Sequence, residues 1–167
     1  MLSRHWARSH REGIELGLAT AALAVGVAVY LLDRGGRVEF VPIALTHSLV
    51  THRVFGSLAG SLPSFVHVFA FALLTAAVLK PWPRFASLSC LAWVLIDVLF
   101  ELGQLHTVAA VLAAHLPGPG GHPWLLAQLR SYFVSGTFDT LDLAAAVAGG
   151  MAAYCVIVAL GREADRA

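Results

Sequence analysis

Residues 141–160 read LDLAAAVAGGMAAYCVIVAL, a stretch in which Asp142 near the start is the single charged residue. A helix needs about 20 mostly apolar residues to cross the hydrocarbon core of a bilayer. The stretch lacks the strict alternation of polar and apolar residues that marks a strand of a membrane barrel. It therefore predicts a transmembrane helix.

Three other apolar segments approach the length of a membrane span, namely residues 14–32, 62–79 and 85–104. Of the 167 residues, 58% are hydrophobic and 13% are charged, whereas charged residues make up about 25% of an ordinary soluble domain. A soluble fold of this size could not hide so much apolar surface. We therefore expect an all-α integral membrane bundle of about four transmembrane helices, forming a single domain over residues 1–167.

Two long connections, residues 33–60 and 105–140, separate these segments. Each contains an apolar stretch of about ten residues, 41–50 and 107–116, which is too short to span a bilayer. We expect both stretches to form short interfacial or re-entrant helices on the outer side. Residues 80–84, by contrast, form a tight turn that makes the second and third segments an antiparallel hairpin.

Lysine and arginine are unequally divided between the two sides of this predicted topology. Seven lie on the side of both termini and four on the other, which favours cytoplasmic termini. The seven are Arg4, Arg8, Arg11, Lys80, Arg84, Arg162 and Arg166, and the four are Arg34, Arg37, Arg53 and Arg130.

Ionisable residues of three predicted helices approach the same, non-cytoplasmic end. Measured from the cytoplasmic end of its helix, His67 lies ~20 Å along, Glu101 ~26 Å and Asp142 ~29 Å, at about 1.5 Å per residue. An ionisable group inside a membrane costs about 2.5–3.5 kcal/mol on insertion scales, so it is a functional candidate by default. We name as the polar cluster His67, Asp97, Glu101, Gln104, Asp139 and Asp142.

Spacing supports this cluster. Asp97, Glu101 and Gln104 follow i, i+4, i+7 and share one helix face. Asp139 and Asp142 open the last helix, where the helix dipole favours carboxylates.

Each member of the polar cluster also has a possible structural role that involves no ligand or reaction. Glu101, Gln104 and Asp142 can mark helix ends at the water interface, and we expect Asp139 to be a helix cap. Asp97 can be a hydrogen-bond partner between helices, and a lone interior histidine such as His67 is ordinarily satisfied by its neighbours.

Other features point to packing rather than chemistry. The pairs Ala145/Gly149 and Ala146/Gly150 predict close helix approach. Cys90 and Cys155 lie in apolar runs and are expected to be small core residues rather than a disulfide. The histidine spacings match no metal motif, so we expect no metal site and no cofactor. A net charge of +1 gives no basic field to attract nucleic acid.

Three motifs together resemble the VanZ-like family of small bacterial membrane proteins. They are His67 early in one helix, Glu101-Leu-Gly-Gln104 at the end of the next, and Gly136-Thr-Phe-Asp-Thr-Leu-Asp142 opening the last. The likeness covers residues 62–155, although Gly136 and Ala146 stand where the family often has Arg and Asn. It implies a multi-pass protein of the bacterial cytoplasmic membrane, with a loose link to the resistance to the glycopeptide teicoplanin that is associated with the namesake.

Three functions are compatible with these residues. The first is an envelope protein whose polar cluster binds the head group of a membrane lipid or lipid-linked small molecule at the outer leaflet. The second is an intramembrane enzyme in which His67 is a general acid or base and Glu101 or Asp142 is its partner. The third is a transporter or channel subunit, which would need a homo-oligomer because four helices are few.

Overall fold

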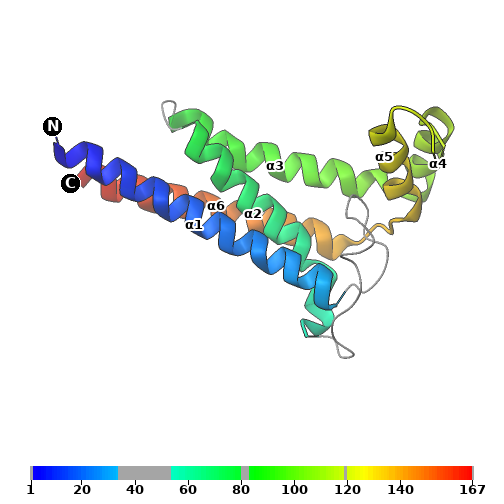
Figure 1. The fold of residues 1–167 in the computed structure, drawn as a ribbon, viewed down its shortest axis with the longest axis horizontal. Coiled ribbons are helices and arrows are strands. Elements are labelled where there is room, and N and C mark those ends of the chain that lie inside the picture. The colour runs from blue at the N-terminus through cyan, green and yellow to red at the C-terminus, as the bar shows by residue number, and fades with distance from the viewer. Residues whose placement is uncertain (1, 34–53, 80–82, 119, 167) are drawn as a thin grey trace.

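The computed structural model describes residues 2–33, 54–79, 83–118 and 120–166, which form helices joined by turns (Figure 1). These residues contain no strand. The helices are α1 (Leu2–Leu32), the short 3-10 helix η2 (Gly56–Ala59), α2 (Leu62–Val78), α3 (Pro83–Gly103), α4 (His106–His115), α5 (Trp124–Ser135) and α6 (Thr140–Arg166).

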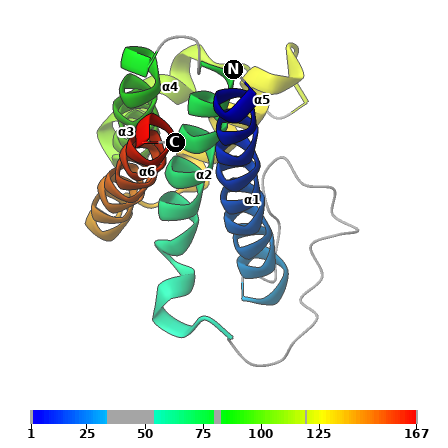
Figure 2. The same ribbon diagram turned by 90° about the vertical axis from the view of Figure 1, so that its left-hand side faces the viewer.

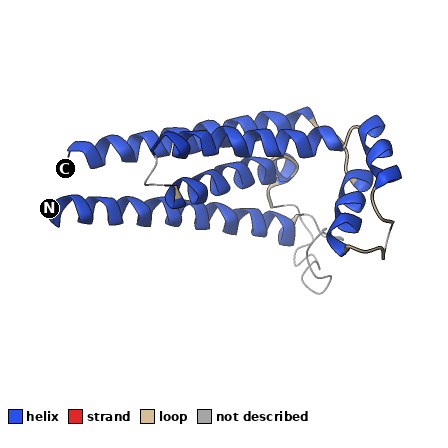
Figure 3. Cartoon of the chain, turned by 90° about the horizontal axis from the view of Figure 1, so that it is seen from above, coloured by secondary structure: helices blue, strands red, loops and turns tan. Residues whose placement is uncertain are grey.

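Four long helices, α1, α2, α3 and α6, run roughly along one axis, with the N- and C-terminal ends together (Figures 1 and 3). Helices α4 and α5 lie across the opposite end of this bundle (Figure 3). Helix α2 is central, because it packs against α1, α3 and α6 (Figure 2). The elements that carry the predicted polar cluster therefore converge at one end.

Helix α6 approaches α2 and α3 closely because its inner face carries small residues. A Cβ atom on Gly149 would lie 2.5 Å from the main-chain oxygen of Phe65 in α2, and one on Gly150 would overlap the side chain of Val94 in α3. Ala146 and Ala153, on the same face, are fully buried. The predicted close approach of this helix is confirmed.

Polar side chains join α2 to α3. The Ser89 hydroxyl donates to the carbonyl oxygen of Ala72 at 3.1 Å, and the Trp93 indole donates to the Thr75 hydroxyl at 2.9 Å. Such bonds satisfy groups that an apolar environment would leave without a partner.

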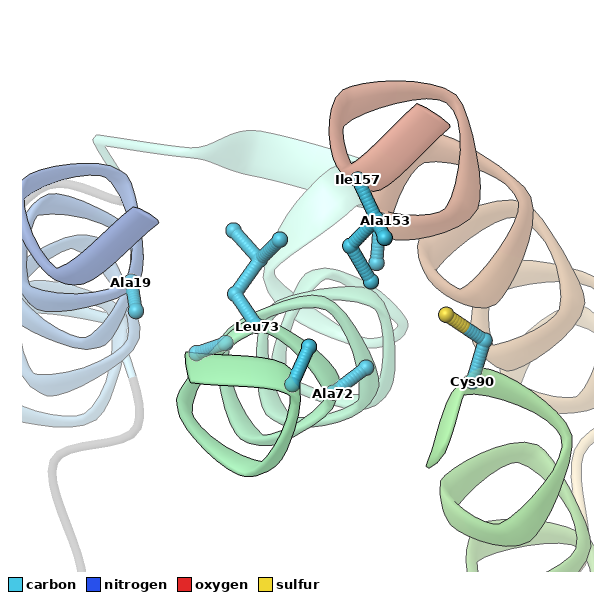
Figure 4. Close-up of a cluster of buried hydrophobic side chains, with 8 residues drawn as sticks. Ala19, Ala72, Leu73, Cys90, Ala153 and Ile157 are labelled. Atoms are coloured by element: carbon cyan, nitrogen blue, oxygen red, sulfur yellow. The ribbon is translucent and has the colours of Figure 1, made fainter. Parts of the chain in front are cut away.

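The apolar core lies where α1, α2, α3 and α6 meet (Figure 4). Cys90 is buried in this core, as expected of a small core residue. The same expectation is wrong for Cys155, which is exposed. Position 155 lies two residues beyond the buried Ala153, and this spacing turns a helical side chain to the opposite face.

Helix α1 begins at Leu2 rather than at residue 14, because polar and charged residues continue the helix ahead of its apolar part. Glu15 is fully buried. It pairs with Arg11 at 2.7 Å, and the same guanidinium donates to the carbonyl oxygen of Ile157 in α6 at 3.4 Å. The pairing allows a carboxylate to be buried inside the bundle.

Two helical segments, His10–Leu32 and Thr140–Arg162, are long and apolar enough to cross a membrane. A third span exists if Ser87–Gly103 and α4 are taken together, although they meet at 88°. Helix α2 has 17 residues and is apolar but shorter. The described chain thus has two or three candidate spans, and the number four stays a prediction.

The second long connection contains two helices where one was expected. Helix α4 (His106–His115) matches the predicted stretch 107–116, whereas α5 was missed. Pro123 before α5 and Gly136 after it are start and stop signals that could have revealed it. The stretch 41–50 and residues 80–82 of the predicted turn lie outside the described residues.

Replacing Gly149 with alanine should weaken the packing of α6 on α2. The new methyl group meets main-chain atoms, which cannot rotate away, so we expect a loss of about 1–3 kcal/mol. Unfolding of the purified protein in detergent micelles measures this loss. Gly17→Ala is the matched control, because a Cβ at Gly17 meets nothing within 4 Å. Equal stability of the two variants would contradict the packing described here.

A polar site at the end of the bundle

Glu101 is the centre of the polar site. It lies in the last turn of α3, and 4% of its surface is exposed. One carboxylate oxygen, Oε1, accepts a hydrogen bond from the main-chain N–H of Asp139, just before α6. The other, Oε2, accepts from the side-chain amide of Gln104 at 3.4 Å. Glu101 therefore ties the end of α3 to the start of α6.

Asp97 and Asp142 bring two further carboxylates to the same place. Asp97 hydrogen bonds with the Ser64 hydroxyl of α2 and is within electrostatic range of Glu101 and Asp142. Glu101 in turn interacts electrostatically with the carboxylates of Asp142 and Asp139. Like charges at short range repel one another, so hydrogen-bond donors or a cation among these carboxylates would stabilise the site.

Gln104 connects the site to α5. Its amide donates to the phenolic oxygen of Tyr132 at 2.8 Å. A Cβ on Gly136 would overlap the side chain of Gln104, so the glycine leaves room for this bond. The small size of Gly136 thus serves the placement of Gln104.

Aromatic rings hold α5 against α3 beside this bond. The centroid of the Phe100 ring lies 5.7 Å from the centroid of the Tyr132 ring and 5.7 Å from that of the Phe133 ring. A Cβ on Gly103 would lie 2.5 Å from the Phe133 ring, so a side chain there would push α5 away. The position of Tyr132 in the site is therefore fixed by packing as well as by its hydrogen bond.

Asp139 caps helix α6, as its sequence position predicts. Its carboxylate Oδ1 accepts from the main-chain N–H of Leu141 at 2.8 Å, the bond expected of an N-cap aspartate. Its own N–H binds Glu101. Asp139 thus caps α6 with its side chain and binds Glu101 with its main chain.

The structure brings together five of the six predicted members of the cluster, namely Asp97, Glu101, Gln104, Asp139 and Asp142. His67 lies one turn after Ser64 on α2. The centroid of its ring is 6.1 Å from the centroid of the Phe71 ring. Phe71 in turn stacks on Trp93 with 4.9 Å between the ring centroids. The participation of His67 in the site stays a prediction.

Two members of the site were missed in the sequence. Ser64 precedes His67 by three residues, a spacing that places it on a neighbouring part of the same helix face. Tyr132 lies in α5, which was not predicted. Within the described ranges, no group of three His, Cys, Asp or Glu side chains is arranged to hold a metal ion.

Comparison with known proteins adds no relative: no family model, curated protein or solved structure matches the chain. The site is therefore interpreted from its own geometry.

Burial, together with the negative charges of Glu101 and Asp97, raises the pKa of Tyr132 from its ordinary value of 10.0 to about 12. The phenol thus stays protonated at every pH at which the protein is expected to work. Its oxygen can accept from Gln104 and still donate its own proton.

The raised pKa makes the stability of the protein sensitive to alkali. The folded state retains the Tyr132 proton better than the unfolded state, so the associated stability is present below about pH 10 and is lost as pH rises through about 12. Unfolding of wild type should therefore become easier as the pH rises from 10.0 to about 12. Tyr132→Phe, measured in parallel, should lose less stability over this interval, and an equal loss in both proteins would contradict the assignment.

Proposed function

We propose that this chain is a VanZ-like protein of the bacterial cell envelope that crosses the membrane four times. In this proposal the polar site binds the head group of a lipid or lipid-linked amphiphile at the outer leaflet. The link to glycopeptide resistance is part of the same proposal, because teicoplanin is an amphiphile with an acyl chain.

The positions of the helix ends support four crossings. The two termini lie at the same end of the bundle (Figure 1), which requires an even number of spans if the long helices cross the membrane. The 17 residues of α2 rise ~25 Å at 1.5 Å each, at the lower limit of a spanning helix. Its central position, enclosed by three longer helices, reduces the length of α2 that must match the lipid.

The observation that carries the proposed binding function is the convergence of three helices on one group of polar side chains. Carboxylates of α3 and α6, a hydroxyl of α2 and the amide of Gln104 meet at one end of an otherwise apolar bundle. A carboxylate oxygen can accept more than one hydrogen bond, so amine and hydroxyl donors of a head group would add bonds to those already present. Charge-assisted hydrogen bonds of this kind are the stronger ones.

The outer surface of α3 supports lipid as the surroundings of the site. Leu95 and Leu99 are 51% and 65% exposed. They lie six and two residues before Glu101, so they face away from its carboxylate and toward the outside of the bundle. In this proposal lipid covers these leucines, and the head-group layer lies near the level of Glu101.

Glu101→Gln tests the function while keeping the shape of the site. Glutamine can still accept from the Asp139 N–H, but it removes the negative charge. A charge-assisted hydrogen bond contributes about 1.5–3 kcal/mol, so binding of an amine-bearing amphiphile should weaken about tenfold or more. Affinity is measured on protein in nanodiscs with phosphatidylethanolamine, phosphatidylglycerol and teicoplanin as separate probes.

Glu12→Gln is the matched control, because Glu12 lies at the other end of the bundle in α1. It should bind as wild type does. If Glu101→Gln is folded and binds all three probes as tightly as wild type, the site does not bind head groups through Glu101 and the proposal is wrong.

A further inference from the structure

Helices α4 and α5 form a separate hairpin at the end of the bundle. Helix α4 turns by 88° from the axis of α3 across a short break, and it packs against α5. The Arg130 guanidinium of α5 donates to the carbonyl oxygen of Ala113 in α4 at 3.1 Å. Arg130, the one lysine or arginine in the helices α4 and α5, is thereby bonded to the last turn of α4, where a helix favours positive charge.

The hairpin exposes apolar side chains where a water-facing helix would carry charge. Helix α4 contains no Asp, Glu, Lys or Arg, yet Val111 is 60% exposed. In α5, Trp124 is 58% and Leu125 is 53% exposed. Keeping such side chains in water costs free energy in proportion to their apolar area.

This apolar surface continues that of α3. Leu99 and Leu102 near the end of α3 are exposed, as are Val108 and Val111 just beyond the bend. The medium that surrounds the exposed leucines of α3 therefore also contacts the first turns of α4. For a helix inside the hydrocarbon region of a membrane, that medium is lipid.

We infer that α4 and α5 lie flat in the outer interface of the bilayer, with the exposed face of α4 in contact with lipid, and that α3 crosses the membrane without α4. The partner of this surface is the lipid bilayer itself. The inference does not depend on the ligand of the polar site.

Geometry opposes the alternative that α3 and α4 form one broken span. A helix perpendicular to α3 adds no depth to the crossing, and the ten residues of α4 extend only ~15 Å. The apolar part of α3, Ser87–Gly103, already rises ~25 Å at 1.5 Å per residue. Trp124 then falls in the interfacial layer where tryptophan is enriched.

Contacts with the bundle hold the hairpin in this orientation. The bond from Gln104 to Tyr132 and the contact of Phe100 with Phe133 attach α5 to the end of α3. The depth of the hairpin in the bilayer is therefore set by the depth of α3.

Spin labels on α4 test this orientation in the full chain, reconstituted in vesicles of phosphatidylethanolamine and phosphatidylglycerol. Single cysteines replace Thr107, Val111 or Ala114 in a background carrying Cys90→Ala and Cys155→Ala. All three labelled positions are exposed, so the labels do not disturb packing. Depth follows from the relative accessibility of each nitroxide to oxygen and to a water-soluble nickel complex.

A flat helix places Thr107→Cys and Ala114→Cys at the same shallow depth, because residues seven apart share a face. The matched control is the pair Leu88→Cys and Leu95→Cys on α3, also exposed and seven residues apart. This control pair should differ in depth by ~10 Å, at 1.5 Å per residue.

Three results would overturn the inference. A depth difference on α4 as large as that on α3 would make α4 part of a span. Full accessibility of the α4 labels to the nickel complex would place the hairpin in water. Exclusion of both reagents, with broadening between labels on neighbouring molecules, would show that a second copy of the chain covers this face.

Discussion

The close approach of α6 to α2 at Gly149 and Gly150 is the contact on which the other features depend. Because Gly149 has no side chain, α6 can rest on the main chain of Phe65, and Gly150 admits Val94 of α3 beside it. Helix α6 therefore packs against both members of the α2–α3 pair at once. This packing sets where α6 begins, and so it brings Asp142 within range of Asp97 and Glu101.

The polar site serves folding as well as any ligand. A carboxylate as buried as Glu101 needs hydrogen-bond donors, and it finds them in the Asp139 N–H and the Gln104 amide. These bonds join α3 to the start of α6 and, through Tyr132, to α5. A ligand that competes for Glu101 or Gln104 would therefore act on the same bonds that attach α5 to the end of α3.

The level of the site along the bundle was predictable, and its composition was only partly so. Counting residues from the predicted cytoplasmic ends placed Glu101 and Asp142 near one level, and the i, i+4, i+7 spacing placed Asp97 and Gln104 on the face of Glu101. Ser64 and Tyr132 were not predictable in the same way, because each reaches the site from another helix. Cys155 was placed in the core wrongly, since an apolar run alone does not show which face of a helix meets its neighbours.

The amino-acid sequence by itself determined that the chain is helical and apolar enough for a membrane, and roughly how far along each helix its ionisable residues lie. Both properties follow from composition and from the constant rise of a helix. Tertiary structure alone decided the rotation of each helix, the 88° bend after α3 and the bond from Gln104 to Tyr132. These features arise from contacts between residues distant in the chain, such as Gln104 with Tyr132, and such contacts leave no periodic signal in the sequence.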